Sequence, residues 1–206
     1  MPNSRLSRDG REDARLVKIC REGDAGAFEG LVRKYQDPVY SIAYRMVGDR
    51  EEARDLAQET FVRAFEGIET FNTRLSFRAW LYRIGANAAI DHLRRRKGKW
   101  RDVPVEIAVA AGDAAGDQSH YGVVIELPGP EADIPENVSV SNETSVMVWD
   151  ALMDLPEHYR AVVVLHHMEG MSYSEIGKVL GVPRNTAKTW GHRARGILCE
   201  ALEGVV

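Results

Sequence analysis

The stretch from Met171 to Leu198 constrains local structure more tightly than any other part of this sequence, because it pairs helix-start signals with helix-stop signals. Ser172 and Glu175 stand three residues apart, which is the spacing of a capping box at a helix N-terminus. Gly181 follows as a helix stop, since glycine adopts the left-handed conformation at little cost. Pro183 then permits a new helix to begin. We therefore predict two helices joined by a tight turn.

The second of these helices presents a face rich in cations and amides. A helix of this kind after a tight turn is the layout that enters the major groove of DNA. Arginine, lysine and asparagine can hydrogen-bond to guanine and adenine edges, and threonine can contact thymine methyl groups. The pattern predicts a DNA-binding helix-turn-helix and leaves open a plain helical hairpin with a solvated basic face. The side chains that this helix offers are Arg184, Asn185, Thr186, Lys188, Thr189, Trp190, His192, Arg193 and Arg195.

Charge is segregated along the 206-residue chain, although the net charge of −4 argues at first against a nucleic-acid partner. Residues 74–101 contain nine Lys or Arg and one acid, and residues 184–195 contain four Lys or Arg and no acid. Residues 102–159 contain twelve acids and neither Lys nor Arg. This segregation matters more than the net charge, because a binding partner contacts one segment of the chain and responds to the charge of that segment.

The N-terminal half has the periodicity of a helical bundle. Apolar residues recur at three- and four-residue steps over residues 28–46, and Asp24 is a plausible N-cap before them. Pro38 interrupts this run, so a kink or a helix restart is expected there. Further helices are expected from about 49 to 68 and from about 76 to 97.

The helix expected over residues 49–68 has two contrasting faces. Phe61 and Phe65 belong to its predicted inward set. Its predicted outer face is acidic and consists of Glu51, Glu52, Asp55, Glu59 and Glu66.

The helix expected over residues 76–97 interleaves aromatic residues with cations. Such a helix suits single-stranded or melting DNA, because cations hold phosphates and planar side chains stack on unpaired bases. The alternative is that the aromatic residues are core and that the Arg run is a solvated helix end favoured by the helix dipole. The periodicity favours the core for Trp80, whereas the cluster at residues 94–97 accompanies a second candidate DNA module.

Helical periodicity is lost over residues 98–143, which are acidic and contain several Pro and Gly. It returns at Thr144 and continues into the helix-turn-helix. We therefore expect an all-α protein with two small helical domains joined by a flexible acidic linker at residues 98–143. An N-terminal helical bundle occupies residues 24–97 after a tail or lead-in at 1–23, and a four-helix domain with the helix-turn-helix occupies 144–206.

The sequence argues against several other classes of protein. No run of about 18 apolar residues predicts a membrane span, and the polar first 15 residues do not resemble a secretory signal. Cys20 and Cys199 make neither a disulfide framework nor a zinc site. A cytoplasmic protein with reduced thiols is expected.

An enzyme that uses the adjacent His166 and His167, or His158 with Glu169, is a further alternative. Adjacent residues on a helix point about 100° apart, so two such histidines do not readily chelate one metal. The sequence contains no phosphate-binding loop, HExxH motif or nucleophile elbow. We therefore expect no catalytic residue, no cofactor and no metal site.

Five short motifs stand out along the chain, at residues 55–61, 77–81, 87–96, 155–156 and 172–176. Together they resemble the extracytoplasmic-function sigma factors, the small two-domain members of the sigma-70 family of bacterial RNA polymerase. The resemblance implies that the first domain binds the polymerase clamp and melts the −10 element, and that the second reads the −35 element. It implies three partners: the polymerase core through the clamp of its largest subunit and through the flap, promoter DNA, and an anti-sigma factor.

The resemblance also implies a role for individual positions. Polymerase binding falls on Asp55, Gln58, Glu59 and Phe61. Contact with the −10 strand falls on Trp80, Arg83, Asn87, Asp91, Arg94 and Arg95. Reading of the −35 element falls on Arg184, Asn185, Thr186, Lys188, Thr189 and Arg193.

The chain departs from the family pattern in its reading helix and in its linker. Trp190 stands where the family usually has Arg, and Gly191 stands where it usually has an apolar residue. These departures bear on which −35 sequence is read and how strongly. The linker is longer and more acidic than the family norm, which suggests that it mimics nucleic acid in a basic channel. A helix-turn-helix regulator without a polymerase role is the alternative function, but it leaves residues 55–61 and the cluster at 94–97 unexplained.

Overall fold

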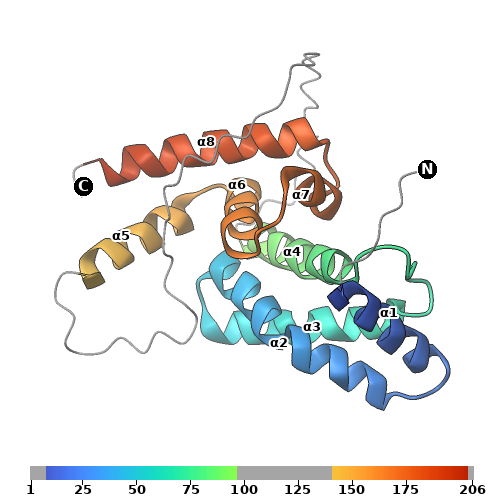
Figure 1. Cartoon of the computed structure of the whole chain (residues 1–206). Helices are drawn as coiled ribbons and strands as arrows, with labels where there is room; N and C mark the ends of the chain where they lie inside the picture. The colour runs from blue at the N-terminus through green and yellow to red at the C-terminus, as the bar shows by residue number, and fades with distance from the viewer. Residues whose placement is uncertain (1–7, 97–140, 204–206) are drawn as a thin grey trace.

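The computed structural model describes residues 8–96 and 141–203, and every regular element in these two ranges is a helix (Figure 1). The all-α prediction is confirmed for them. The predicted linker lies outside the described residues, except that its last three positions already belong to a helix. The N-terminal bundle consists of α1 (Arg8–Arg21), α2 (Gly26–Val47), α3 (Arg50–Gly67) and α4 (Phe77–Arg96). The C-terminal unit consists of α5 (Ser141–Asp154), α6 (Glu157–Val163), the π-helix η1 (Val164–Met168), α7 (Tyr173–Leu180) and α8 (Arg184–Leu202).

Pro38 lies inside α2, which runs without a break from Gly26 to Val47, so the expected helix restart at this proline is wrong. Proline removes one helical hydrogen bond at a cost of about 3 kcal/mol. Tyr35, Val39 and Ile42 on either side of it are buried. Their packing outweighs the local cost and keeps the helix continuous.

The N-terminal ends of α2 and α3 lie close to their predicted positions. Asp24 Oδ1 accepts a hydrogen bond from the Gly26 amide at 2.9 Å, although the N-cap of α2 is Ala25. Asp49 Oδ1 accepts hydrogen bonds from the amides of Glu51 and Glu52, both at 2.9 Å. Asp49 therefore satisfies two of the free amides at the start of α3.

Helix α1 lies in a segment that the sequence analysis treated as a tail or lead-in. It packs on α2 and α4, and its Asp13 carboxylate is buried. Asp13 accepts hydrogen bonds at 2.7 Å from the Tyr35 hydroxyl and from Lys34 Nζ. Burial, and then the bond to Asp13, raise the pKa of Tyr35. A buried carboxylate with two donors joins α1 to the bundle.

The C-terminal unit has a small core of its own, in which Leu155 is fully buried. Helix α8 packs against α5, α6 and α7, and Figure 1 shows it at the opposite end of the molecule from α1–α3. The core consists of Val148, Ala151, Leu152, Leu155, Val163, Ala194 and Leu198.

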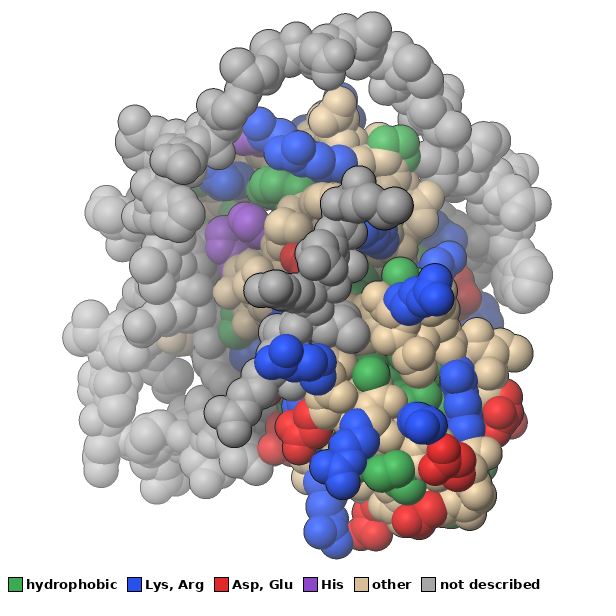
Figure 2. All heavy atoms as spheres, turned by 45° about the vertical axis from the view of Figure 1, so that its right-hand side comes forward, with side chains coloured by type: hydrophobic (Ala, Val, Ile, Leu, Met, Phe, Trp, Pro, Cys, Tyr) green, Lys and Arg blue, Asp and Glu red, His purple; other side chains and the backbone are tan. Residues whose placement is uncertain are grey.

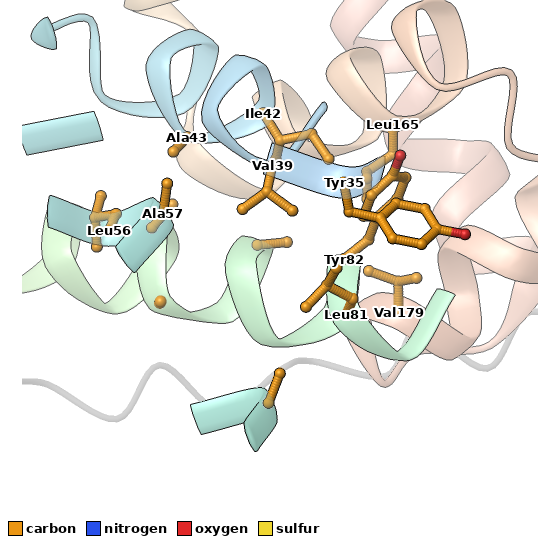
Figure 3. Close-up of a cluster of buried hydrophobic side chains, with 14 of the residues drawn as sticks. Tyr35, Val39, Ile42, Ala43, Leu56, Ala57, Leu81, Tyr82, Leu165 and Val179 are labelled. Carbon is orange, nitrogen blue, oxygen red and sulfur yellow. The ribbon is translucent and has the colours of Figure 1, made fainter. Parts of the chain in front are cut away.

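The two units also share a continuous apolar core. Figure 3 shows Leu165 and Val179 of the C-terminal unit beside Tyr35 and Tyr82 of the N-terminal bundle. The Tyr82 hydroxyl is hydrogen-bonded to the carboxylate of Glu169, and burial and this bond raise the pKa of Tyr82. In this structure the predicted domains are therefore packed on one another.

Candidate nucleic-acid and protein interfaces

The helix-turn-helix forms as its capping signals predict. The Ser172 amide donates to Glu175 Oε2 at 2.9 Å, and the Glu175 amide donates to Ser172 Oγ at 3.3 Å. The bond from the Ser172 amide lowers the pKa of Glu175, because it favours the ionised carboxylate. Gly181 ends α7 with a φ of 71°, and α8 begins directly after Pro183. The capping box and the glycine stop are confirmed.

The turn between α7 and α8 needs glycine at a second place that the sequence analysis did not single out. A Cβ on Gly177 would lie 2.7 Å from the carbonyl oxygen of Val182, which is closer than packed atoms come. The absence of a side chain at Gly177 lets the turn fold back onto α7, where the Val182 amide donates to the Gly177 carbonyl oxygen at 2.8 Å.

Helix α8 presents the predicted reading residues away from the core. Arg184, Asn185, Thr189 and Arg193 are exposed, while Thr186 and Lys188 are half-buried. The inward side of the helix consists of Ala187, Gly191, Ala194 and Leu198. The structure therefore leaves a cationic and amide-bearing face of α8 open to a partner.

Trp190 lies on the flank of α8 that contacts α6. It is half-buried, and its ring lies 4.7 Å from the ring of His158. On the same flank the Arg193 guanidinium donates to the Tyr159 hydroxyl at 3.5 Å. Trp190 thus holds the reading helix against the rest of the unit.

Five of the six predicted −10 residues lie along one exposed side of α4. Arg83, Asn87, Asp91 and Arg95 are spaced by four residues, so they follow one another on the same face of the helix, and Arg94 adjoins them. All five side chains are exposed. The opposite side of α4 is buried in the bundle.

Trp80 is separate from this stripe. Its ring lies 4.7 Å from Phe71 and 5.6 Å from Phe77, and the side chain is half-buried. The expected packing role is therefore present. Its contact with DNA stays a prediction.

The cations at the end of α4 have nearby acids. Arg94 Nε lies 3.9 Å from Glu157 Oε1 in the C-terminal unit, and Arg96 Nη1 lies 3.2 Å from Glu52 Oε2 on α3. The two Arg side chains are exposed, while Glu157 and Glu52 are half-buried. Both cations are therefore paired and still accessible to a partner.

Helix α3 exposes both polar and apolar side chains on one side. Asp55 and Gln58 are exposed there, and they are followed at helical spacing by Val62, which is 57% exposed, and Phe65, which is 48% exposed. The inward placement predicted for Phe65 is wrong, because the side chain is exposed, although its ring makes an edge contact with Phe28. Neighbouring exposed apolar side chains with a polar surround are typical of protein interfaces.

The other two predicted polymerase-binding residues, Glu59 and Phe61, are less exposed than Asp55 and Gln58. Glu59 pairs with Arg63 at 2.6 Å on the same helix, and Phe61 is half-buried against the core. Val62 and Phe65 were absent from the predicted set. The signal that could have revealed them is an apolar pair in the acidic face of the helix.

Figure 2 shows one face of the molecule, on which Lys and Arg side chains are spread and acidic side chains lie toward the lower edge. The predicted −10 and −35 residues lie on two different helices, α4 and α8.

The described residues meet neither the requirements of a metal site nor those of a membrane-spanning helix. Within residues 8–96 and 141–203, no three His, Cys, Asp or Glu side chains gather to hold a metal ion. No helix in the same ranges has the length and hydropathy to cross a bilayer. His166, from the predicted histidine pair, stacks on Tyr173 and its Nδ1 lies 2.8 Å from the Met171 carbonyl oxygen.

Known proteins resemble this chain over nearly its whole length. The model of Sigma-70 region 2 matches residues 31–99, and the model of Sigma-70 region 4 matches residues 145–198. The ECF RNA polymerase sigma factor SigW of Bacillus subtilis is 36% identical over 90% of this chain and 94% of the relative. The RNA polymerase sigma-H factor of Pseudomonas aeruginosa is 32% identical over 93% of this chain and 94% of the relative.

Solved structures share the fold. CnrH in complex with the cytosolic domain of CnrY matches with a TM-score of 0.64 at 24% identity, over 93% of this chain and 97% of that one. The sigma factor RpoE in complex with the anti-sigma factor NepR, from Bartonella quintana, matches with a TM-score of 0.59 at 21% identity, over 86% and 97%. At these identities the likeness concerns the arrangement of helices.

Proposed function

Because this chain belongs to the extracytoplasmic-function sigma factors of the sigma-70 family, we propose that it directs RNA polymerase core to promoters by reading a −35 element and melting a −10 element. The observation that carries this proposal is the exposed polar stripe on α4, which consists of Arg83, Asn87, Asp91, Arg94 and Arg95. Helix α8 of the same chain exposes a second, separate face that is cationic and amide-bearing.

The polar stripe on α4 suits the binding of a DNA strand that is being separated from its complementary strand. Arg83, Arg94 and Arg95 supply cations for phosphates, and Asn87 and Asp91 between them can hydrogen-bond to exposed base edges. Trp80 lies in the first turn of the helix on the buried rings of Phe71 and Phe77, and its half-exposed ring offers a surface on which an unpaired base can stack.

Reading of the −35 element is assigned to the outward side of α8. Arg184, Asn185, Lys188 and Thr189 lie within its first two turns, where recognition helices meet base edges. Thr186 and Arg193 flank this set. Arg and Asn favour guanine and adenine respectively.

Polymerase binding is assigned to the exposed side of α3. Asp55, Gln58 and Glu59 supply polar and acidic contacts, and Val62 and Phe65 supply apolar area beside them. An apolar centre with a polar rim is the usual anatomy of a protein interface. A clamp surface with basic residues would be its electrostatic complement.

An inhibitory protein partner also fits the family. Two of the solved structures that share this fold are complexes, one of CnrH with the cytosolic domain of CnrY and one of the sigma factor RpoE with the anti-sigma factor NepR. We expect this chain to be bound by an anti-sigma factor that competes with polymerase.

The rival function, a helix-turn-helix regulator without a polymerase role, predicts a different binding pattern. Equilibrium binding of the labelled chain to purified core polymerase separates the two. A sigma factor binds core without DNA, and selects promoter sequences far better in that complex than alone. A chain that binds a specific duplex alone and ignores core would support the rival.

A further inference from the structure

Gly191, in the middle of α8, leaves room for a ring from α7. It is buried on the inward side of α8, and glycine weakens a helix interior, so its presence there calls for a packing reason. A Cβ at this position would lie 2.7 Å from the Tyr173 hydroxyl oxygen and 2.8 Å from its Cε1 atom. Both separations are below contact distance. Any larger residue at Gly191 would force α8 and Tyr173 apart.

Tyr173 is held from its other side and does not readily yield. Its ring stacks on His166, with ring centroids 4.5 Å apart and an interplanar angle of 24°. His166 is itself fixed through its Nδ1 atom, 2.8 Å from the Met171 carbonyl oxygen. A clash at Gly191 would therefore move α8 more readily than it would move the ring.

A second contact fixes the neighbouring position on a different flank of the helix. Trp190 packs on His158 of α6, with ring centroids 4.7 Å apart. Gly191 thus allows α8 to pack closely on α7, while Trp190 packs it against α6.

Asn185, Lys188 and Thr189 lie within two turns of these contacts and move with the helix. Hydrogen bonds to base edges need donor and acceptor atoms about 2.7–3.2 Å apart, so a small displacement of α8 changes which edges are reached. We infer that Gly191 with Tyr173, and Trp190 with His158, are positioning contacts that set the seating of α8 and thereby select among −35 sequences without touching DNA. The inference rests on the proposed function of α8.

The test compares Gly191→Ala with Gly196→Ala on the same helix. Gly196 is exposed, and a Cβ there would meet nothing within 4 Å, so it reports the effect of the extra methyl group alone. Each holoenzyme transcribes a promoter pool with a fixed −10 element and a randomised −35 element, and transcripts are sequenced. We expect Gly191→Ala to change the relative use of −35 sequences by about tenfold. Gly196→Ala should leave their order unchanged.

A rescue separates positioning from stability. Tyr173→Leu lacks the outer ring atoms that a Cβ at Gly191 would meet, so the double variant Tyr173→Leu/Gly191→Ala should move back toward the wild-type order. Thermal unfolding is measured for every variant. A purely structural role for Gly191 would lower the unfolding temperature and leave the order of preferred −35 sequences as in the wild type, and that result overturns the inference.

If Gly191→Ala does not fold, Trp190→Leu takes its place, because it removes the ring that packs on His158 and leaves Gly191 unchanged. A changed −35 order then supports the inference, and an unchanged order overturns it. Failure of the proposed function looks different: the wild-type chain itself would then start no promoter-dependent transcript with core polymerase.

Discussion

The guanidinium of Arg160 donates a hydrogen bond to the carbonyl oxygen of Met46, 114 residues earlier in the chain. The same side chain donates to the carbonyl oxygens of Met153 and Leu155. Only 4% of Arg160 is exposed, and burial lowers its pKa. One buried cation therefore caps the end of α5 and ties the C-terminal unit to the end of α2.

Arg160→Leu should destabilise the protein by about 3 kcal/mol, because three buried carbonyl groups lose their charged donor. Calorimetry gives the free energy of unfolding and shows whether the two units still melt together. Arg195→Ala, at an exposed position of α8, serves as the control and should change stability by no more than about 0.5 kcal/mol. Equal effects of the two substitutions would show that the Arg160 contacts contribute nothing.

Stability should fall as the solution is acidified below pH 6.5, in part because of His158. Burial lowers the pKa of His158 in the folded chain from its ordinary value of 6.5. Well above pH 6.5 the imidazole is neutral in both states, so it adds no pH dependence there. Below pH 6.5 the unfolded chain takes up a proton that the folded chain resists, and the free energy of unfolding decreases.

His158→Phe removes this contribution while keeping a ring against Trp190. Urea unfolding at a series of pH values should show a shallower loss of stability for the variant than for the wild type. An identical loss in both proteins would rule out His158 as a source of the pH dependence.

Val62→Lys should weaken binding to core polymerase by about tenfold, because it places a charge in the apolar centre of the proposed α3 interface. The side chain is exposed, so the unfolding temperature should stay close to that of the wild type. Gln36→Lys, on the exposed side of α2, adds the same charge elsewhere and should bind core normally. If Val62→Lys bound core polymerase with wild-type affinity, the proposal that Val62 on α3 lies in the polymerase interface would be wrong.

Arg95→Ala should weaken promoter binding and lower its dependence on salt. Loss of one phosphate contact reduces the slope of log affinity against log salt concentration by about one. The measurement is a salt titration of promoter binding by the holoenzyme. Arg15→Ala on α1, which removes an exposed cation outside both DNA faces, should keep the wild-type slope. Equal slopes for Arg95→Ala and the wild type would mean that Arg95 contacts no phosphate.

Local signals in the sequence predicted much of this structure. The capping box at Ser172, the glycine stop at Gly181 and the helix start near Asp49 each depend on a few neighbouring residues, and each forms as expected. The exposed stripe from Arg83 to Arg95 follows in the same way from a spacing of four residues. Caps and helix faces that depend on residues within one or two turns can be predicted from the sequence without knowledge of the rest of the fold.

The features that were missed depend on partners distant in the sequence. Helix α1 is held by Asp13, whose donors Lys34 and Tyr35 belong to the next helix. Phe65 has the spacing of a core residue, yet little of the bundle covers it. The need for glycine at Gly191 depends on the Tyr173 ring from another helix. Periodicity identifies faces of a helix, but it does not reveal what covers them.

Run-off transcription with purified core polymerase tests the central claim most directly. On a promoter selected from a random pool, core together with this chain should produce a discrete transcript from one start site, and core alone should not. Loss of that transcript when the −10 or the −35 element is scrambled would tie the activity to both DNA faces. Equal transcription by core with and without the chain, across the whole pool, would contradict the account.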